Sequence, residues 1–308
     1  MTMQNLAIVD LGSNSVRLAV NELRDDGTYR EVNRVKADSR LSEGMGPEKI
    51  LQPKAMERTI AALRSFRPYY EQLPQLIVRG IATAAVRQAR NRDEFLAQVK
   101  RATNIDLEVL TGDQEAYYDY LGAVNRLKVK DCLLLDTGGA SCELVHVKDG
   151  RDANLISVPF GAVNLSEQFH LDDRVAAVDL FSAQVFLRER LRDIWWLNDA
   201  KHLPLVLLGG ANRTLARMNR QQQKILHVEN IHGYRLTTDQ VMRTFQRLLA
   251  VPLRERKRIS GLETERADII LGGMLPLVTL LQMLDSDRVV FSESGVREGI
   301  ISEYLSQR

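Results

Sequence analysis

The stretch Leu133–Val145 reads Leu-Leu-Leu-Asp-Thr-Gly-Gly-Ala-Ser-Cys-Glu-Leu-Val, and the interpretation of the whole chain depends on it. The apolar run before Asp136 is typical of a buried strand. Gly138 and Gly139 then allow the backbone to turn tightly and to come close to a ligand, and a second strand follows. This order of residues predicts a phosphate-binding hairpin.

The same layout occurs near the start of the chain, where Ile8–Leu18 reads Ile-Val-Asp-Leu-Gly-Ser-Asn-Ser-Val-Arg-Leu. Both stretches follow the pattern Asp-x-Gly-x-x-Ser-x-(Arg/Glu)-Leu, and Asp10 and Asp136 are separated by 136 − 10 = 126 residues. This offset is too long for a solenoid repeat. It predicts two similar domains that face each other, each offering one loop to a shared cleft.

The two hairpins are expected to carry opposite charges, because side chains two residues apart on a strand share a face. Ser15 and Arg17 share one face in the first hairpin, and Ser141 and Glu143 share one face in the second. Either loop alone is equally well interpreted as an ordinary turn with a satisfied aspartate. The repetition of one pattern in both halves favours a functional interpretation.

The composition indicates two domains and no strong electrostatic bias. A chain of 308 residues is long for a single core. The net charge is only +2, from 42 basic and 40 acidic residues, so the bulk charge gives no indication of a nucleic-acid partner. Cys132 and Cys142 have no Cys or His at metal-ligand spacing, and we expect them to be reduced core thiols in a cytoplasmic protein.

Membrane and zinc chemistry are not expected. The N-terminus lacks a positive segment before an apolar run, so a signal peptide is not predicted. The longest apolar stretch, Ile269–Leu284, is shorter than the roughly 20 residues of a membrane span and contains Pro276, which predicts a buried helix. The five histidines are scattered without metal-site spacing.

Strand and helix signals recur in the same order in both halves: a set of antiparallel hairpins, then alternating helices and strands. Beyond the hairpins, strands are predicted at 31–37, 75–82, 106–110, 154–159, 203–208 and 289–292, and long helices at 53–69 and 179–196. The sequence therefore predicts a duplicated α/β fold.

Several charged residues have both an ordinary and a functional interpretation. Glu115 follows the Thr111-Gly112 turn at a helix start, where it either balances the helix dipole or holds an attacking water. Arg87 lies one turn into a helix whose N-terminus can hold an anion. A basic stripe, Arg213, Arg217, Arg220 and Lys224, follows Gly209-Gly210 with spacings of 4, 3 and 4, and is either a solvated helix face or a guide for a polyanion.

Taken together, these motifs resemble the exopolyphosphatase and guanosine pentaphosphate phosphohydrolase family, within the actin, hexokinase and heat-shock-chaperone ATPase superfold. The resemblance runs through Ile8–Leu18, Thr83–Asn91, Gly112–Gly122, Asp136–Leu144, Val158–Glu167, Gly209–Ala216 and Arg266–Glu303. It implies two duplicated ribonuclease-H-like domains with mixed sheets flanked by helices and a cleft between them. The domains would cover 1–125 and 126–296, with the final helix 297–308 packed back on the first, as in the family's short two-domain form.

The resemblance also implies a role for individual residues. Glu115 matches the catalytic glutamate, Arg17 and Arg87 match phosphate-binding arginines, and Asp136, Glu143 and Asp10 would position magnesium. The implied substrate-binding residues are Asp10, Gly12, Ser13, Asn14, Ser15, Thr83, Gly138, Gly139, Ser141, Gly209, Gly210, Arg213 and Arg217. The backbone N–H groups of Gly12, Ser13, Gly138 and Gly139 would cradle the terminal phosphoryl group.

The implied activity is release of terminal orthophosphate from inorganic polyphosphate by magnesium-assisted attack of water. Two alternatives stay open: a guanosine pentaphosphate 5′-phosphohydrolase, and a non-catalytic sensor that binds polyphosphate or a nucleotide. The sequence does not separate the two enzymes, whereas the retained Glu115 argues against the sensor. The resemblance further implies a homodimer.

Overall fold

The computed structural model describes residues 4–307. The chain divides into two compact units: unit 1 runs to Gly112 and takes in the chain from Tyr304 onward, and unit 2 comprises Asp113–Glu303. Compact units are defined by packing, whereas the predicted domains follow the duplicated sequence pattern. The predicted boundaries at residues 125 and 296 therefore stay a prediction.

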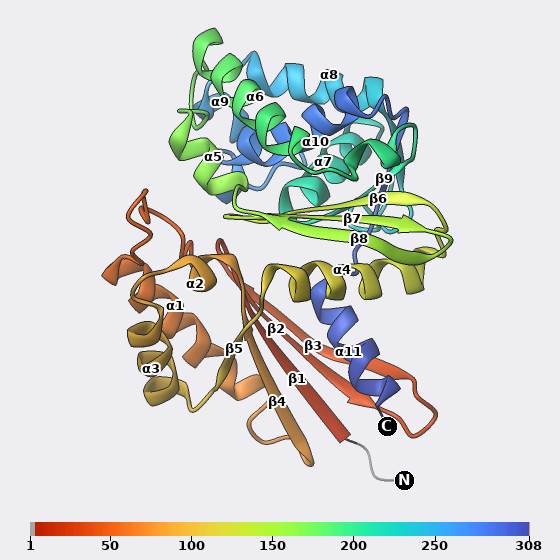
Figure 1. The fold of residues 1–308 in the computed structure, drawn as a ribbon. Coiled ribbons are helices and arrows are strands. Elements are labelled where there is room, and N and C mark those ends of the chain that lie inside the picture. Colours follow the sequence, from red (N-terminus) through yellow and green to blue (C-terminus); the bar gives the residue numbers. More distant parts are fainter. Residues whose placement is uncertain (1–3, 308) are drawn as a thin grey trace. The chain divides into compact units, whose positions relative to one another are not determined.

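Unit 1 contains a five-stranded mixed sheet in the order β3-β2-β1-β4-β5 (Figure 1). Its strands are β1 (Gln4–Leu11), β2 (Val16–Leu23), β3 (Tyr29–Ala37), β4 (Leu76–Ala82) and β5 (Leu107–Val109). The first three strands are antiparallel, and β4 and β5 run parallel to β1. The predicted hairpins and parallel strands of the first half are therefore present.

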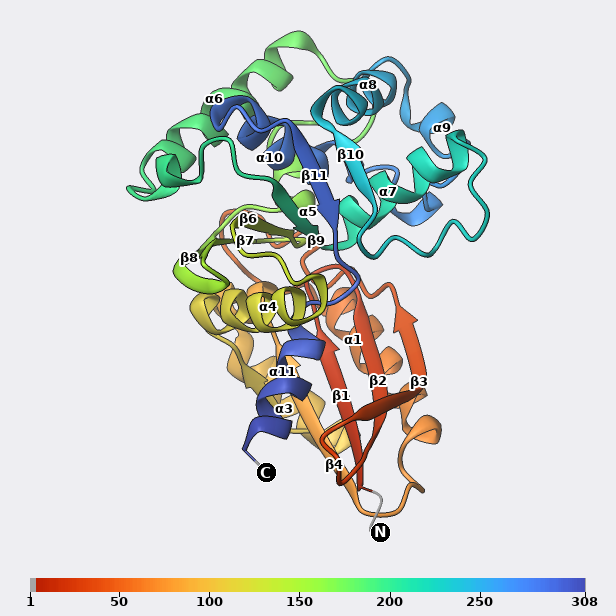
Figure 2. The ribbon, with the colours of Figure 1, turned by 90° about the vertical axis from the view of Figure 1, so that its right-hand side faces the viewer.

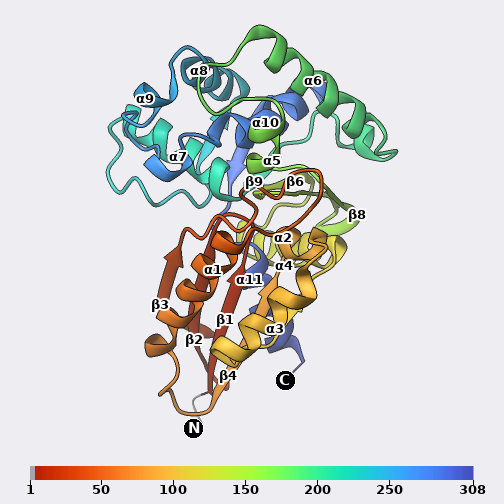
Figure 3. The ribbon, with the colours of Figure 1, turned by 90° about the vertical axis from the view of Figure 1, so that its left-hand side faces the viewer.

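Helices α1 (Pro53–Phe66), α2 (Ala84–Gln88) and α3 (Arg92–Thr103) cover one face of this sheet (Figure 3). Val9 and Leu18 of the sheet share a core with Leu63 of α1 and Phe95 of α3, and all four side chains are fully buried. This core fixes the sheet edge at which β1 ends and the first predicted phosphate loop begins.

Unit 2 contains a six-stranded mixed sheet in the order β10-β11-β9-β6-β7-β8. Its strands are β6 (Cys132–Thr137), β7 (Cys142–Lys148), β8 (Arg151–Val158), β9 (Leu205–Leu208), β10 (Arg235–Thr237) and β11 (Arg288–Phe291). Strands β6, β7 and β8 are antiparallel, whereas β9 runs parallel to β6 and β11 parallel to β9. Because β6–β9 repeat the arrangement of β1–β4, the predicted duplicated α/β fold is confirmed.

Helices cover both faces of the second sheet (Figure 2). They are α4 (Gly112–Leu127), α5 (Ala162–Gln168), α6 (Ala177–Arg192), α7 (Gly210–Gln222), α8 (Thr238–Leu249), α9 (Leu253–Arg256) and α10 (Ile270–Met283). The last helix of the chain is α11 (Val296–Ser306). Leu134 of β6 packs with Ala116 and Ala123 of α4, whereas its neighbours Leu133 and Leu135 share the core on the other face. A strand covered on both faces reads as a continuous apolar run, which explains the Leu-Leu-Leu sequence before Asp136.

The longest apolar stretch forms the buried helix that the sequence predicts. Helix α10 lies in the core of unit 2, and Pro276 occurs within it. Among residues 4–307, no helix combines the length and the apolar character that crossing a membrane requires.

Candidate active site

The two predicted phosphate loops connect antiparallel strands, and the strand register places a charged pair beside each loop. Asp10 lies directly opposite Arg17 in the β1–β2 pair, and Asp136 lies directly opposite Glu143 in the β6–β7 pair. Opposite charges across an antiparallel pair are stabilising, and like charges are destabilising. Unit 1 therefore sets opposite charges across its strand pair, whereas unit 2 sets two carboxylates across its strand pair.

Both loops close with the same backbone hydrogen bond. The Gly12 N–H donates to the Ser15 carbonyl at 3.1 Å, and the Gly138 N–H donates to the Ser141 carbonyl at 3.0 Å. A Cβ atom at either glycine would lie 3.1 Å from the acceptor carbonyl, so each turn favours glycine on steric grounds. The Gly12 and Gly138 N–H groups are thus used within the turns and are not available for the predicted phosphate cradle.

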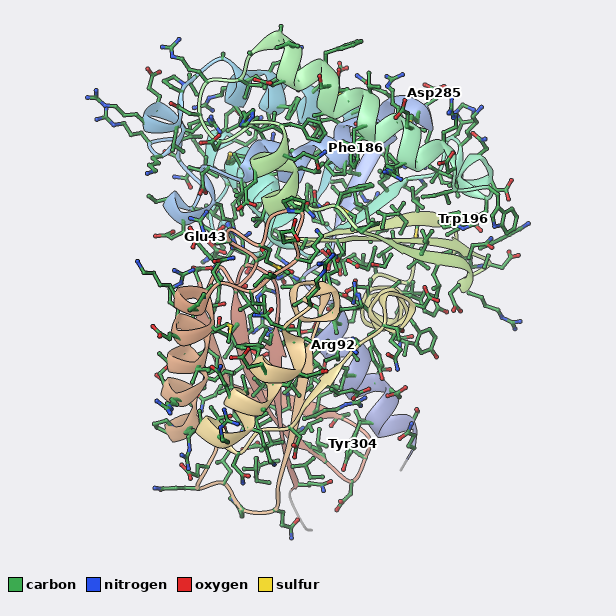
Figure 4. All side chains as sticks on the ribbon, turned by 60° about the vertical axis from the view of Figure 1, so that its left-hand side comes forward. Glu43, Arg92, Phe186, Trp196, Asp285 and Tyr304 are labelled. Carbon is green, nitrogen blue, oxygen red and sulfur yellow. The ribbon has the colours of Figure 1, made fainter. Side chains whose placement is uncertain are left out.

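In each unit, backbone N–H groups of another segment hold the carbonyl oxygens of the loop. In unit 1, the Ser42 and Arg40 N–H groups donate to the carbonyls of Ser13 and Asn14, both at 2.9 Å. Figure 4 labels Glu43 on this segment, which Arg58 of α1 anchors through a 2.7 Å ion pair.

In unit 2, the N-terminus of α5 has the corresponding role. The Ala162 N–H donates to the Gly138 carbonyl at 2.9 Å, and the Val163 N–H donates to the Gly139 carbonyl at 2.8 Å. The loop carbonyls thus accept hydrogen bonds from the protein, whereas the N–H groups of Ser13 and Gly139 have no protein acceptor within residues 4–307. Of the four N–H groups predicted to bind the phosphoryl group, these two are therefore available to a ligand.

Three further candidates of unit 1 lie at the first loop or next to it. The amide nitrogen and oxygen of the Asn14 side chain are buried and have no hydrogen-bond partner within residues 4–307. The Ser13 hydroxyl accepts from the Ala85 N–H at 3.2 Å, which ties the loop to α2, and the Thr83 N–H donates to the Leu11 carbonyl at 3.2 Å. A buried amide without a protein partner indicates a position that a polar ligand would satisfy.

Arg87 lies in the last turn of α2, and one of its guanidinium nitrogens, Nη1, donates to the Leu110 carbonyl at 3.0 Å. This bond holds the half-buried side chain between β5 and α2 within unit 1. The phosphate-binding roles of Arg17 and Arg87 stay predictions.

Unit 2 brings together three of the four predicted acidic residues, Glu115, Asp136 and Glu143, whereas Asp10 belongs to unit 1. The Glu143 side chain is 1% exposed and accepts a 2.7 Å hydrogen bond from the Ser157 hydroxyl. Burial raises the pKa of Glu143 well above its usual value, and the charges of Glu115 and Asp136 raise it further. Hydrogen bonds from Ser157 and Ser141 oppose this shift without reversing it.

Asp119 is a fourth carboxylate in the same region, and the sequence analysis did not identify it. It lies one helical turn after Glu115 on α4 and is 0% exposed. Burial raises the pKa of Asp119 well above its usual value, and the charges of Asp136, Glu143 and Glu115 add to the shift. The four-residue spacing from Glu115 was the only available signal, since it places both side chains on one helix face.

The chemistry of this carboxylate cluster fits a hard divalent cation. All four side chains offer oxygen ligands, which suit magnesium or calcium rather than zinc. Within residues 4–307, no three Asp, Glu, His or Cys side chains form a ready-made metal cage. Magnesium usually keeps several waters and binds through one or two protein carboxylates with substrate phosphates, so Asp136 and Glu143 would suffice.

The Gly209-Gly210 turn packs against the second loop and against a buried arginine. Gly209 has a φ of +84°, and a Cβ atom there would meet Oδ1 of Asp136. A Cβ atom at Gly210 would meet the guanidinium group of Arg266, which is ion-paired with Glu263 at 2.8 Å. Both glycines therefore serve close packing in unit 2, and their role in substrate binding stays a prediction.

The basic stripe along α7 is largely engaged within unit 2. Arg217 forms ion pairs with Glu263 at 2.8 Å and Glu229 at 3.2 Å, and Arg213 donates to the Glu293 carbonyl at 3.3 Å. Arg220 donates to two backbone carbonyls and lies 4.9 Å from the centre of a tyrosine ring. These contacts give no support to Arg213 and Arg217 as substrate-binding residues, which stay predictions.

Comparisons with known proteins show the family of the chain. The sequence pattern of the Ppx/GppA phosphatase family matches residues 21–308. A bifunctional 3-dehydroquinate synthase/phosphatase of Fusobacterium nucleatum is 28% identical over 98% of this chain and 47% of that protein, so the chain spans about half the length of this curated relative.

Two solved structures also resemble the chain. A Ppx/GppA family member from Aquifex aeolicus is 30% identical, with a TM-score of 0.80 over 100% of this chain and 99% of that one. An exopolyphosphatase from Cytophaga hutchinsonii has a TM-score of 0.89 at 24% identity, covering 99% of this chain and 98% of that one. The second similarity concerns the fold alone.

Proposed function

Because the chain belongs to the Ppx/GppA phosphatase family, we propose that it releases orthophosphate from the end of inorganic polyphosphate by hydrolysing the terminal phosphoanhydride bond. The observation that carries this proposal is the opposed Asp136 and Glu143 pair, with Glu115 close enough to raise the pKa of Glu143. A cation would compensate these carboxylates when they lose their protons, and a polyphosphate chain is a substrate that a divalent cation accompanies.

Glu115 is the proposed general base. Its side chain is 9% exposed at the start of α4, where it would accept a proton from water as the water oxygen attacks the terminal phosphorus. The bridging P–O bond breaks, and the shortened chain leaves with the electron pair. Asp136 and Glu143 would hold Mg²⁺, which supplies neutralisation of charge on the phosphate oxygens.

Unit 1 contributes phosphate binding in this proposal. The Ser13 N–H and the Asn14 side-chain amide, which have no protein partners within residues 4–307, would donate to phosphate oxygens. Arg17 and Arg87 would neutralise the terminal phosphoryl group as charge redistributes during bond breaking.

The test measures orthophosphate release by the purified chain from long polyphosphate, tripolyphosphate and guanosine pentaphosphate, with and without Mg²⁺. We expect Mg²⁺-dependent release from polyphosphate and a drop of about a hundredfold or more in kcat for Glu115→Gln, with little change in substrate binding. Exclusive use of guanosine pentaphosphate would contradict the substrate proposal. Binding of polyphosphate without any turnover would indicate a sensor, and normal turnover by Glu115→Gln would remove this residue from its role.

A cytoplasmic location and a homodimer are further parts of the proposal. Cys132 and Cys142 are free and buried, as expected for a protein of a reducing compartment. Burial raises the pKa of Cys132 to about 12, so this thiol is unreactive at neutral pH. The homodimer rests on resemblance to the family, and light scattering of the full chain tests it directly.

A further inference from the structure

We propose that Asp119 is a positioning residue that strengthens binding of a divalent cation by Asp136 and Glu143. The inference rests on the proposed function only in assigning the cation to this cluster. Asp119 lies on α4, whereas Asp136 lies near the end of β6 and Glu143 near the start of β7, so three separate elements bring these carboxylates together.

Asp119 is fully buried beside other carboxylates. Asp119 is 0% exposed, and within residues 4–307 neither of its carboxylate oxygens makes a hydrogen bond of standard geometry. The three charged groups that affect it most are all carboxylates, those of Asp136, Glu143 and Glu115. Burial in this cluster therefore disfavours the charged form of Asp119, and a nearby cation would compensate that charge.

Asp119 is placed to act on the cation indirectly. No three acidic side chains within the described residues are arranged to coordinate one ion together, so Asp119 does not complete a direct ligand set. Magnesium retains several waters when protein carboxylates hold it, and outer carboxylates orient both the ligands and those waters. Asp119 would therefore act through its charge and through the water shell of the ion.

A purely structural role is the alternative. Oδ1 of Asp119 lies close to Gly295, and the Val296 N–H at the start of α11 favours the charged form of Asp119. A carboxylate near a helix N-terminus stabilises the helix. However, Glu298 already accepts a 2.9 Å hydrogen bond from the Gly295 N–H at the same helix end, so α11 has its own acidic partner.

The experiment replaces Asp119 with the uncharged Asn of similar shape and measures Mg²⁺ affinity by calorimetry without substrate. Asp113→Asn is the matched control, since this exposed carboxylate lies on the same helix outside the cluster. We expect about tenfold weaker Mg²⁺ binding for Asp119→Asn and no change for Asp113→Asn, in line with the usual effect of outer-shell residues. A second variant, Asp119→Ser, removes the charge with a smaller side chain and guards against misfolding of the first.

Thermal unfolding in the presence of a chelator separates the two roles. If Asp119 serves the cation, Asp119→Asn keeps or raises the metal-free Tm, because asparagine cannot carry the charge that is costly to bury, and the rise in Tm on adding Mg²⁺ becomes smaller. If Asp119 only stabilises α11, the metal-free Tm falls and Mg²⁺ affinity is unchanged, which overturns the inference. Absence of Mg²⁺ binding by the unaltered chain also overturns it, whereas failure of Glu115→Gln to impair turnover affects only the proposed function.

Discussion

Gly161→Ala tests whether the backbone behind the second phosphate loop controls activity. Gly161 precedes α5 with a φ of −158°, an extended conformation that alanine adopts without strain. The added Cβ atom would lie 2.7 Å from the Gly138 carbonyl oxygen and 2.8 Å from both the Gly139 carbonyl carbon and the Ala140 nitrogen. These three atoms belong to the backbone, so no side chain can rotate away to make room.

The expected magnitude follows from these distances. Ordinary van der Waals contacts of a Cβ atom begin at 3.4 Å, so the loop and α5 must separate by about 0.6 Å. Overpacking of this kind costs about 1–3 kcal/mol of stability. Because misplacement of a binding group by about 1 Å can lower the rate by about a hundredfold, we expect kcat/KM to fall at least about tenfold.

The assay compares phosphate release from polyphosphate with the Tm of the same samples. Val278→Ala is the control, because it removes core volume from α10 without touching the loop and costs roughly 2 kcal/mol. We expect this control to keep normal kinetics at 25 °C. Normal kcat/KM for Gly161→Ala would refute the reasoning, and an equal loss in both variants would attribute the effect to stability instead of loop position.

Two further predictions concern charge. Because the pKa of Glu143 is raised, the metal-free folded chain holds a proton that cation binding must displace, so Mg²⁺ affinity should rise with pH above the usual carboxyl range. Over the same pH range the metal-free Tm should fall, since the unfolded chain has already lost this proton. Calorimetry in buffers of different ionisation enthalpy measures how many protons Mg²⁺ binding releases. An Mg²⁺ affinity that does not change with pH would contradict the prediction. Arg217→Gln breaks the ion pairs to Glu263 and Glu229 and should lower stability by about 1 kcal/mol while leaving the ratio of kcat/KM on long and short polyphosphate unchanged. A selective loss on long chains would instead support the predicted polyanion-guiding role of the stripe.

The hairpins and the duplicated fold could be predicted because their signals are local. The Asp-x-Gly-x-x-Ser pattern places each aspartate at a strand end, and both turns close through the glycine and the residue three positions later. The same argument gives the charged pairs, since a tight turn fixes which residues lie opposite one another. The position of Asp136 opposite Glu143 could therefore be predicted from the sequence.

Other parts depend on packing between distant segments. Asp119 lies on α4 among tyrosines and other polar residues, a setting that does not predict burial. It is buried because distant segments, such as the one at Gly295, pack against it. Strand β10 has three residues, too few for a recognisable alternation, and it pairs only with β11. The ion pairs of Arg217 likewise involve Glu263, 46 residues away, so spacing along α7 could not reveal them.

If unit 2 binds the proposed cation, the charge difference between the two strand pairs predicts different lifetimes for the two halves of the chain when magnesium is scarce. The β1–β2 pair sets Arg17 opposite Asp10, and opposite charges across a strand pair need no cation between them. The β6–β7 pair sets Glu143 opposite Asp136 and would lose a stabilising partner whenever the proposed cation leaves. A protease should then cut first within unit 2, so that supply of the cation would control how long the protein persists as well as how fast it works.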